Sequence, residues 1–271
     1  MNPKYRISVI MGIYNCAPTL QEALDSLYAQ TCQDFKIILC DDGSKDDTLK
    51  IAEENARLHD NVIVIKNERN MGLNYTLNHC LEYADTEYVA RMDGDDVSMP
   101  TRFEKEIKFL DEHKEYAIVS CGMEYFDESG TFGKSSCSVT IPTKETFAHS
   151  TPHCHAPCMV RTEAYKNVGG YTVDKRLLRN EDYNLWMKMY ALGLRGYNIP
   201  EHLYAMRDDR NATARRDVRC RLNAIYSLTL AYRTLHFSFL GYVRSVAEEI
   251  VKIVAPTFVY DYFHRKRLNI K

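Results

Sequence analysis

The sequence has nine cysteines but no Cys-x-x-Cys pair, and its first residues lack the apolar stretch and cleavage site of a secretory signal peptide. We therefore expect reduced thiols and a cytoplasmic protein. Internal repeats and low-complexity tracts are also missing. With 45% hydrophobic residues, the composition is that of an ordinary globular protein.

Long apolar runs are missing as well. The strongest candidate for a membrane span, residues 224–243, is interrupted by Arg233 and His236, and an arginine at the centre of a membrane helix costs about 2.5–3.5 kcal/mol on insertion scales. Residues 251–267 are aromatic and basic but too short to span. Both segments fit attachment to a membrane surface better than a transmembrane helix.

Charge is unevenly distributed. Residues 219–271 hold nine Lys/Arg and three Asp/Glu, a net charge of +6, so residues 1–218 carry −8 of the total of −2. The basic end also contains nine aromatic residues. This combination indicates an anionic surface, and the absence of a nucleic-acid recognition motif favours a membrane over a nucleic acid. The alternative is a helical extension that packs its aromatic side chains on the main domain.

Residues 1–113 alternate between apolar runs and amphipathic segments. Strands are expected within residues 6–15, 35–44, 61–70 and 87–93, and helices within 17–31, 46–59, 72–84 and 101–113. This order predicts an α/β fold with a mostly parallel sheet and right-handed crossovers. Beyond it we expect a strand within 116–128, irregular structure over 130–180, a helix over 180–193 and mostly helices after 218.

Acidic residues gather after the expected strands. Asp41 and Asp42 follow the second strand, and Asp93, Asp95 and Asp96 follow the fourth. Ligands of open parallel sheets bind at this edge. Five acids with few basic neighbours repel one another, unless a divalent cation or the hydroxyls of a ribose pair with them. One acidic turn is weak evidence, because Asp and Gly are common in turns; two on one edge indicate a ligand site.

Several segments, in order, resemble the family 2 glycosyltransferases, which have the GT-A fold. They are SVIMGIYN, LDSLYAQTCQDFKIILCDDGSKDDT, NMGLNYTLN and EYVARMDGDDVSMPTRF, with a weaker resumption in NEDYNLWMKM. The resemblance implies a catalytic domain over residues 1–218, with nucleotide-sugar binding in 1–110 and the acceptor side in 111–218, followed by a helical region over 219–271. It also implies an inverting enzyme of bacterial polysaccharide assembly.

The resemblance assigns roles on the donor side. Tyr14 and Asn15 would lie by the base and ribose of a nucleotide sugar, usually UDP-linked, and Asn70 belongs to the same edge. Asp42 would reach the base, with Asp41 supporting the turn. Likewise, Asp93 would hold the ribose, and Asp95 would reach Mn²⁺ or Mg²⁺ on the diphosphate. A metal and an arginine suit this chemistry, because they neutralise the leaving diphosphate.

On the acceptor side, EDYNLW resembles the family's Glu-Asp motif. Asp182 would be the general base that takes the proton of the acceptor hydroxyl, with Glu181 beside it. Acids that follow Asn180 are also typical of a capped helix N-terminus, which is the alternative interpretation. Adjacent residues of a helix point in different directions, so we expect only one of the two to face the acceptor.

The segment HSTPHCHAPCMVR combines histidines and cysteines, which are zinc-ligand types. Its spacing matches no standard zinc site, and no second cysteine pair lies nearby. The family has a His-Pro segment here, so His155 of His-Ala-Pro would line the acceptor or diphosphate side of the cleft. A loop histidine exposed to water is the alternative.

In LYAMRDDRNAT, Arg207 matches a family arginine that would reach the diphosphate. Asp209 stands where a histidine is common, so no contact is carried over to that position. Asn211-Ala-Thr matches a glycosylation sequon, which a cytoplasmic chain would not use.

Two other functions remain open. A sugar-nucleotidyltransferase would carry a glycine-rich basic loop after the first strand, which MGIYNCAPT lacks. A non-catalytic nucleotide-binding module of the same fold would not need Asp93, Asp95 and Asp182. The expected acceptor is a glycan or a polyprenyl-diphosphate-linked sugar, met at the cytoplasmic face of the membrane.

Overall fold

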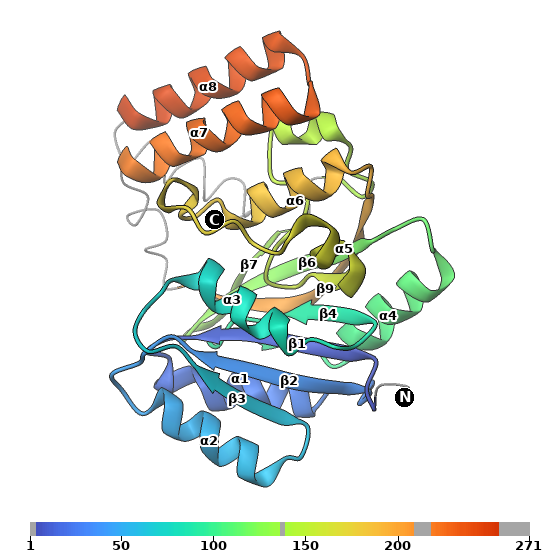
Figure 1. Ribbon diagram of the computed structural model, residues 1–271, viewed down its shortest axis with the longest axis vertical. Helices are drawn as coiled ribbons and strands as arrows, with labels where there is room; N and C mark the ends of the chain where they lie inside the picture. Colours follow the sequence, from blue (N-terminus) through green and yellow to red (C-terminus); the bar gives the residue numbers. More distant parts are fainter. Residues whose placement is uncertain (1–3, 136–138, 209–217, 255–271) are drawn as a thin grey trace.

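The computed structural model describes residues 4–135, 139–208 and 218–254 (Figure 1). One nine-stranded sheet has the order β3-β2-β1-β4-β8-β6-β9-β5, and β7 pairs with β6. The strands are β1 (Ile7–Ile13), β2 (Phe35–Asp41), β3 (Val62–Lys66), β4 (Tyr88–Arg91), β5 (Val97–Ser98), β6 (Ile118–Asp127), β7 (Gly130–Ser135), β8 (Met159–Arg161) and β9 (Gly196–Arg207).

Helices cover both faces of this sheet (Figure 1). The α-helices are α1 (Ala17–Tyr28), α2 (Thr48–Leu58), α3 (Leu73–Glu82), α4 (Arg102–Glu112), α5 (Thr162–Val168), α6 (Glu181–Ala191), α7 (Val218–Leu235) and α8 (Phe239–Val254). Two short 3-10 helices are η1 (Lys144–Ala148) and η2 (Lys175–Leu177).

The N-terminal half has the architecture expected from the sequence. β1 pairs in parallel with β2 and β4, and β2 pairs in parallel with β3. β2 is a continuous buried apolar run apart from its ends, as is usual for a strand covered on both faces. The complete sheet is mixed, because β8 runs antiparallel to β4 and β6, and β5 runs antiparallel to β9. The mostly parallel arrangement therefore holds for the first half only.

The C-terminal half is more regular than expected. β7, β8 and α5 lie within residues 130–180, for which irregular structure was expected, and β9 was not anticipated at all. The middle of β9, Pro200 to His202, breaks the alternation that marks a strand in a sequence. Its parallel pairing with β6 shifts register there, beside Gly122, where an added Cβ would lie 3.0 Å from the His202 ring. A bulge of this kind hides a strand from pattern analysis.

Each face of the sheet has its own core. Leu20, Leu24 and Phe103 fill the core between the sheet and α1, α2 and α4. The other core, under α3, α5 and α6, contains Leu77 and Trp186. α7 packs on α6, and α8 packs on α7, so that α8 forms the outermost layer at one end of the molecule (Figure 1). Among the described residues, no helix is both long and apolar enough to cross a membrane.

We expect Leu24→Ala to lower the free energy of unfolding by about 2–5 kcal/mol, because it removes a fully buried side chain from a packed core. Urea denaturation followed by circular dichroism measures the change. Leu58→Ala is the matched control: Leu58 is 72% exposed, so its truncation should cost less than about 0.5 kcal/mol. Equal losses in both variants would contradict this assignment of the core.

Candidate functional site

The loops after β1 and β2 are tied to each other. Asn15 has a left-handed φ of +48°. Its side-chain oxygen accepts a hydrogen bond from the Lys45 N–H at 2.8 Å, and its own N–H donates to the Ser44 hydroxyl at 3.0 Å. The Asp41 carboxylate accepts from the N–H groups of the turn that follows it. Tyr14 directly follows β1 and precedes Asn15, and its side chain is 45% exposed.

Asp42 organises the loop after β3. Only 4% of it is exposed, and its carboxylate accepts hydrogen bonds from Asn67 Nδ2 at 2.8 Å, the Met71 N–H at 2.7 Å and the Gly72 N–H at 2.9 Å. Asn70 lies in the same loop and is exposed. The loop passes so close to β2 that an added Cβ on Gly43 would lie 2.9 Å from the Asn70 nitrogen.

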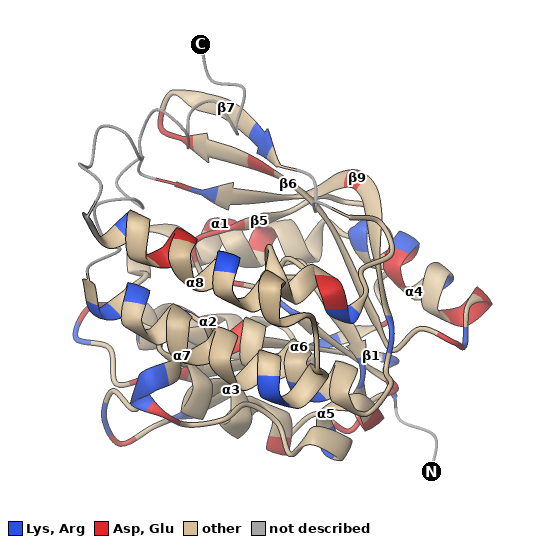
Figure 2. Ribbon diagram, turned by 90° about the horizontal axis from the view of Figure 1, so that it is seen from above, with Lys and Arg blue, Asp and Glu red and all other residues tan. Residues whose placement is uncertain are grey.

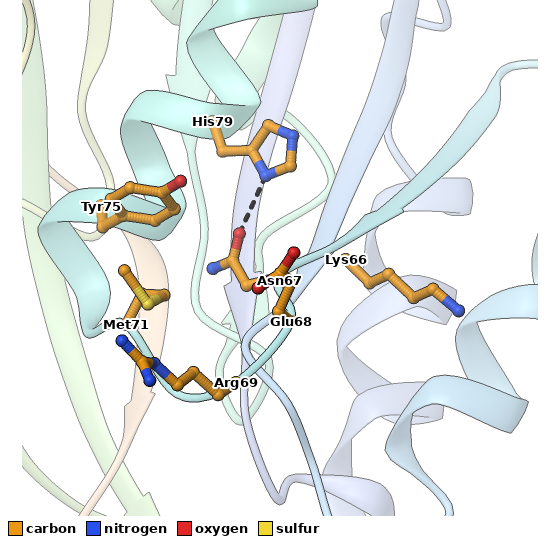
Figure 3. A pocket seen from close by; sticks show the side chains of 7 residues that line it. All are labelled: Lys66, Asn67, Glu68, Arg69, Met71, Tyr75 and His79. Atoms are coloured by element: carbon orange, nitrogen blue, oxygen red, sulfur yellow. Dashed lines mark hydrogen bonds between the residues drawn. The ribbon is translucent and has the colours of Figure 1, made fainter.

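A pocket of about 270 Å³ adjoins this loop at the carboxyl end of β3 (Figure 3). Met71 and Tyr75 lie on one side of it, and His79 lies above Asn67. Asn67 Oδ1 is 2.9 Å from His79 Nδ1, while its Nδ2 reaches Asp42. Asn67 therefore connects Asp42 to the pocket, which the sequence pattern did not reveal.

The three carboxylates after β4 face different surroundings. Asp96 is buried and accepts from the Tyr204 hydroxyl and from the Arg207 N–H, both at 2.8 Å. Burial, followed by the charges of Asp93 and Asp95, raises the pKa of Asp96 well above its usual range. Asp96 thus joins this loop to β9, and Asp95 is the exposed member of the group.

Asp95 and Arg207 lie side by side. Arg207 Nε donates to the main-chain oxygen of Asp95 at 3.1 Å, and its guanidinium lies 4.4 Å from the centre of the Phe126 ring. The same guanidinium forms an ion pair with Glu22 of α1, a partner that the sequence did not suggest. Partial desolvation by the surrounding protein raises the pKa of Asp95, and the negative charge of Asp93 raises it further. Asp209 and Asn211 lie outside the described residues.

Glu181 and Asp182 begin α6, but they have different environments. Asn180 occupies the N-cap position without a side-chain capping hydrogen bond. Glu181 Oε1 instead accepts from the Arg179 N–H at 2.9 Å. Burial raises the pKa of Asp182, while hydrogen bonds from the Tyr183 N–H and the Thr151 side chain, and the nearby positive charge of a β4 arginine, oppose that rise.

His155 is not a water-exposed loop residue, which settles that alternative. Its Nε2 lies 2.8 Å from the Tyr171 hydroxyl, and its ring meets Trp186 edge-on, with the ring centres 6.0 Å apart. Burial lowers the pKa of His155 well below its usual range, so the ring is neutral. Gly170, at a φ of +66°, brings Tyr171 into this contact, and an added Cβ there would lie 2.5 Å from Asn78 Oδ1.

The neighbouring histidine serves the fold. His153 is buried, with Nδ1 2.7 Å from Asn198 Oδ1 and Nε2 3.0 Å from the Tyr190 hydroxyl. Both ring nitrogens are therefore occupied. In the part of the chain that the structure describes, no three His, Cys, Asp or Glu side chains gather closely enough to hold a metal ion. His153 thus serves as a buried hydrogen-bonding residue between Asn198 and Tyr190.

Sequence reasoning missed Arg91. It ends β4, is 4% exposed, and places Nη2 2.5 Å from Asp93 Oδ1. The signal was available, because residues two apart in a strand project to the same face. Arg91 also bears on the other half of the site, since it is the β4 arginine whose charge acts on Asp182. The structure therefore pairs the buried Arg91 with Asp93 at the tip of β4.

Comparison with known proteins identifies the family of the chain. A family model described as glycosyl transferase family 2 matches residues 8–169. Putative glycosyltransferase EpsE of Bacillus subtilis is 39% identical over 269 residues, covering 99% of this chain and 96% of the relative. A UDP-Gal:alpha-D-GlcNAc-diphosphoundecaprenol beta-1,3-galactosyltransferase of Escherichia coli is 27% identical over 271 residues, covering 97% of this chain and 96% of the relative.

Solved structures show the same fold. Residues 1–349 of S. aureus TarS in complex with UDP-GlcNAc superpose with a TM-score of 0.69 at 21% identity, covering 90% of this chain and 71% of that TarS fragment. The mannosyltransferase PcManGT from Pyrobaculum calidifontis, in complex with GDP-Man and Mn²⁺, superposes with a TM-score of 0.65 at 20% identity. The match covers 100% of this chain and 83% of the PcManGT chain. The expected GT-A fold is thereby confirmed. From the family match and the 39% identity to a relative of nearly equal length, we conclude that the chain belongs to glycosyl transferase family 2.

Proposed function

We propose that this protein is an inverting glycosyltransferase that moves a sugar from a UDP-linked donor to a glycan or polyprenyl-diphosphate-linked acceptor in cell-surface polysaccharide biosynthesis. One observation carries the proposal: Asp42 and the Arg91–Asp93 pair lie at the carboxyl ends of β2 and β4, the two strands that flank β1, in a chain that belongs to glycosyl transferase family 2. The names of the relatives support the acceptor class, since one is an E. coli enzyme for a diphosphoundecaprenol-linked acceptor and another is an Erwinia amylovora amylovoran biosynthesis glycosyltransferase.

The donor would lie across the carboxyl ends of β1, β2 and β4. Tyr14 offers an exposed ring for the base, and Asp42 has spare acceptor capacity for a base N–H, because a carboxylate has about four lone-pair positions and three hydrogen bonds to Asp42 are present. Asn15 and Asn70 lie at the same edge of the sheet. Asp41 stabilises the turn after β2 by accepting hydrogen bonds from the N–H groups of Gly43 and Ser44. Binding of UDP and UDP-GlcNAc by TarS favours UDP, whereas PcManGT with GDP-Man keeps GDP as the alternative.

A divalent cation suits the tip of β4. Asp95 is exposed, and repulsion by Asp93 helps to raise its pKa, so a cation there would relieve that repulsion. The described residues offer no closed cage of three such ligands. An ion held by one carboxylate, with diphosphate oxygens and water as its other ligands, is a common arrangement for Mg²⁺. Bound Mn²⁺ or Mg²⁺ would neutralise charge on the leaving diphosphate.

Asp182 would act as the general base. Its carboxylate takes the proton of an acceptor hydroxyl while that oxygen attacks the anomeric carbon from the side opposite UDP. The bond from the anomeric carbon to the diphosphate breaks, and its electron pair leaves with UDP. One displacement inverts the configuration, so an α-linked donor gives a β-linkage. Arg207 would exchange Glu22 for the diphosphate, while Glu181 and neutral His155 would position the acceptor.

A donor screen tests the proposal. The purified protein is incubated with Mn²⁺ and a panel of UDP- and GDP-sugars, and nucleotide release is measured with and without EDTA. We expect metal-dependent release from one UDP-sugar. The absence of release from every donor, together with no metal-dependent UDP binding by calorimetry, would overturn the enzyme and favour a non-catalytic module. Release of pyrophosphate from UTP and a sugar phosphate would instead favour a nucleotidyltransferase.

We also propose that the protein works at the cytoplasmic face of a membrane, on which α8 lies. Tyr232 of α7 stacks on Tyr242 of α8, with the ring centres 4.7 Å apart. Phe239 lies beside both rings and is 66% exposed. Leu240, Val243 and Val251 are exposed along the same helix. In Figure 2, α8 and α7 lie at the front, and α8 carries charges of both signs. The net charge of +6 over residues 219–271 fits anionic lipid.

Co-flotation with vesicles tests this contact. We expect the protein to float with phosphatidylglycerol vesicles and not with phosphatidylcholine vesicles. The triple variant Leu240→Ser, Val243→Ser, Val251→Ser should bind at least about tenfold more weakly, because each exposed apolar side chain loses its transfer into the lipid interface. Leu58→Ser with Leu192→Ser is the control, since both residues are exposed elsewhere on the surface. Equal flotation of all three proteins would contradict attachment through α8.

A further inference from the structure

The acidic loop after β4, residues 92–96, packs closely on the N-terminal end of α1. The Thr19 hydroxyl donates a hydrogen bond to the Gly94 oxygen at 3.0 Å. Gly94 also lies so near Cys16 that an added Cβ would be 2.9 Å from its Sγ atom. These contacts fix the side of the acidic loop that faces α1. A second set of contacts comes from β9, where Tyr204 lies.

Tyr204 bridges the two ends of the sequence Asp93-Gly94-Asp95-Asp96. It is fully buried, and its hydroxyl oxygen lies 3.2 Å from the Asp93 nitrogen and 2.8 Å from Asp96 Oδ2. Because an amide N–H can only donate, the phenol oxygen accepts from Asp93 and its own proton goes to Asp96. One oxygen atom therefore joins the main chain of Asp93 to the side chain of Asp96, and the exposed Asp95 lies between these two anchor points.

The ring of Tyr204 is itself held in place by a buried cation. Arg102 is fully buried, and its guanidinium carbon lies 5.1 Å from the centre of the Tyr204 ring, a contact that cation–π attraction favours. The same guanidinium donates to the Arg91 oxygen at 2.8 Å and pairs with the buried Glu106 at 3.3 Å. In the main chain, Tyr204 is paired with Ser98 of β5. The hydroxyl therefore reaches the acidic loop from a fixed position.

We propose that Tyr204 is a positioning residue for donor binding: its hydroxyl holds the acidic loop in the conformation that presents Asp93 and Asp95 to the nucleotide sugar and its metal ion. The inference rests on the proposed function, which assigns donor contacts to these two carboxylates. It goes further, because it makes donor affinity depend on a residue of β9 that is too deeply buried to touch the donor. A hydroxyl that served only the fold would affect the melting temperature and leave UDP affinity unchanged.

Tyr204→Phe tests the inference by removing a single oxygen atom. The Asp93 N–H and Asp96 Oδ2 lose their shared partner, and an unpaired polar group in the interior is unfavourable, so the acidic loop should open more often. Amide hydrogen exchange over residues 92–98, followed by mass spectrometry, should therefore become faster. The Kd for UDP with Mn²⁺, measured by calorimetry, should rise about tenfold, because apparent affinity falls with the fraction of molecules in the binding-competent conformation.

Tyr88→Phe is the matched control. Tyr88 is also fully buried and begins β4, at the opposite end of the strand from the acidic loop. Its hydroxyl likewise has two partners: it accepts from Arg161 Nη1 at 3.4 Å and donates to Asp111 Oδ1 at 2.8 Å. The loss of this hydroxyl should lower the melting temperature and leave both the exchange of residues 92–98 and the Kd for UDP at their wild-type values.

Faster exchange of residues 92–98 together with weaker UDP binding in Tyr204→Phe supports the inference. Unchanged exchange overturns it, and so does faster exchange at wild-type UDP affinity, which would make the hydroxyl purely structural. If Tyr204→Phe does not fold, judged by circular dichroism, Asp96→Asn perturbs the same contact from its other side. Asparagine has one acceptor oxygen for two donors, the Tyr204 hydroxyl and the Arg207 N–H, so UDP affinity should again fall. Wild-type affinity in that variant would overturn the inference.

The two readouts separate this inference from the proposed function. A wild-type protein that binds no UDP, with or without Mn²⁺, overturns the proposed function. Hydrogen exchange needs neither nucleotide nor turnover, so it still decides whether Tyr204 holds the acidic loop. Normal UDP binding by the wild type, combined with unchanged binding by Tyr204→Phe, overturns the inference and leaves the proposed function standing.

Discussion

Asp182→Asn is expected to lower kcat for sugar transfer about 10³-fold, the usual contribution of a general base. Asparagine keeps the size of the side chain and one acceptor oxygen, and it cannot take the proton of the acceptor hydroxyl. Donor KM should change little, because donor contacts are expected from Asp42, Asp93 and Asp95. Steady-state kinetics with the true donor and a synthetic lipid-linked acceptor measures both constants.

Glu163→Gln is the control for this variant. Glu163 is also an acid in the first turn of a helix, α5, but its side chain is 75% exposed and pairs only with Lys166. Its replacement should leave kcat within about twofold, since exposed ion pairs contribute little. An Asp182→Asn enzyme that retains a tenth or more of the wild-type kcat would assign the base to another residue.

The pH dependence of kcat is expected to follow the ionisation of the Asp182 carboxyl group. Burial raises the pKa of Asp182 above that of an ordinary aspartate. A base must be ionised to accept a proton, so kcat should fall as the pH drops through this raised pKa, at a higher pH than an exposed aspartate would give. Measuring kcat at saturating donor over a pH series gives the apparent pKa of this acidic limb. If the limb disappears from the residual activity of Asp182→Asn, Asp182 is the group that titrates.

Asp95→Asn is expected to lower metal-dependent turnover about 10³-fold, because a cation on the diphosphate supplies several kcal/mol of transition-state stabilisation. Asp95 is the exposed carboxylate of the β4 loop, whereas Asp96 is buried against Tyr204. Calorimetric titration with UDP, with and without Mn²⁺, provides a readout that does not need turnover. The wild type should bind UDP more tightly with Mn²⁺, and Asp95→Asn should lose that difference.

Two comparisons sharpen the metal experiment. Asp60→Asn removes an exposed acid before β3, at the opposite end of the sheet, and should keep the Mn²⁺ effect on UDP binding. Asp96→Asn weakens the link to β9 and should lower the melting temperature. If Asp95→Asn binds UDP with the same Mn²⁺ dependence as the wild type, Asp95 is not the metal ligand.

Much of the donor side was predictable from the sequence. The alternation of apolar runs and amphipathic segments fixed the order of elements through α4, and parallel strands necessarily bring Asp42 and Asp93 to one edge. The strand alternation also placed Arg91 and Asp93 on the same face, although this signal was overlooked. Local pattern was sufficient here because β1 to β4 pair with one another in regular parallel register. It did not reveal β5, which pairs with the distant strand β9.

The rest of the site depended on contacts between residues distant in the sequence. Tyr204 and Asp96 are 108 positions apart, and Arg207 and Glu22 are 185 apart, so no local pattern reveals either pair. The sequence did not predict β9, because a proline and a register shift interrupt its pattern. Without β9, the hydrogen bonds that bury Asp96 against this strand could not be inferred. The burial of His155 likewise follows from Tyr171 and Trp186, which pack on it from other elements.

The sequence by itself determined the family, the parallel half of the sheet and the residues that form the acidic edge, because these follow from periodicity and from motifs that are contiguous in the chain. Only the tertiary structure decided which carboxylate of the β4 loop is exposed, which is buried, and which arginine pairs with Asp93. The physical reason is that the ionisation and orientation of a side chain depend on burial and on neighbouring charges, and those are set by packing across the whole sheet.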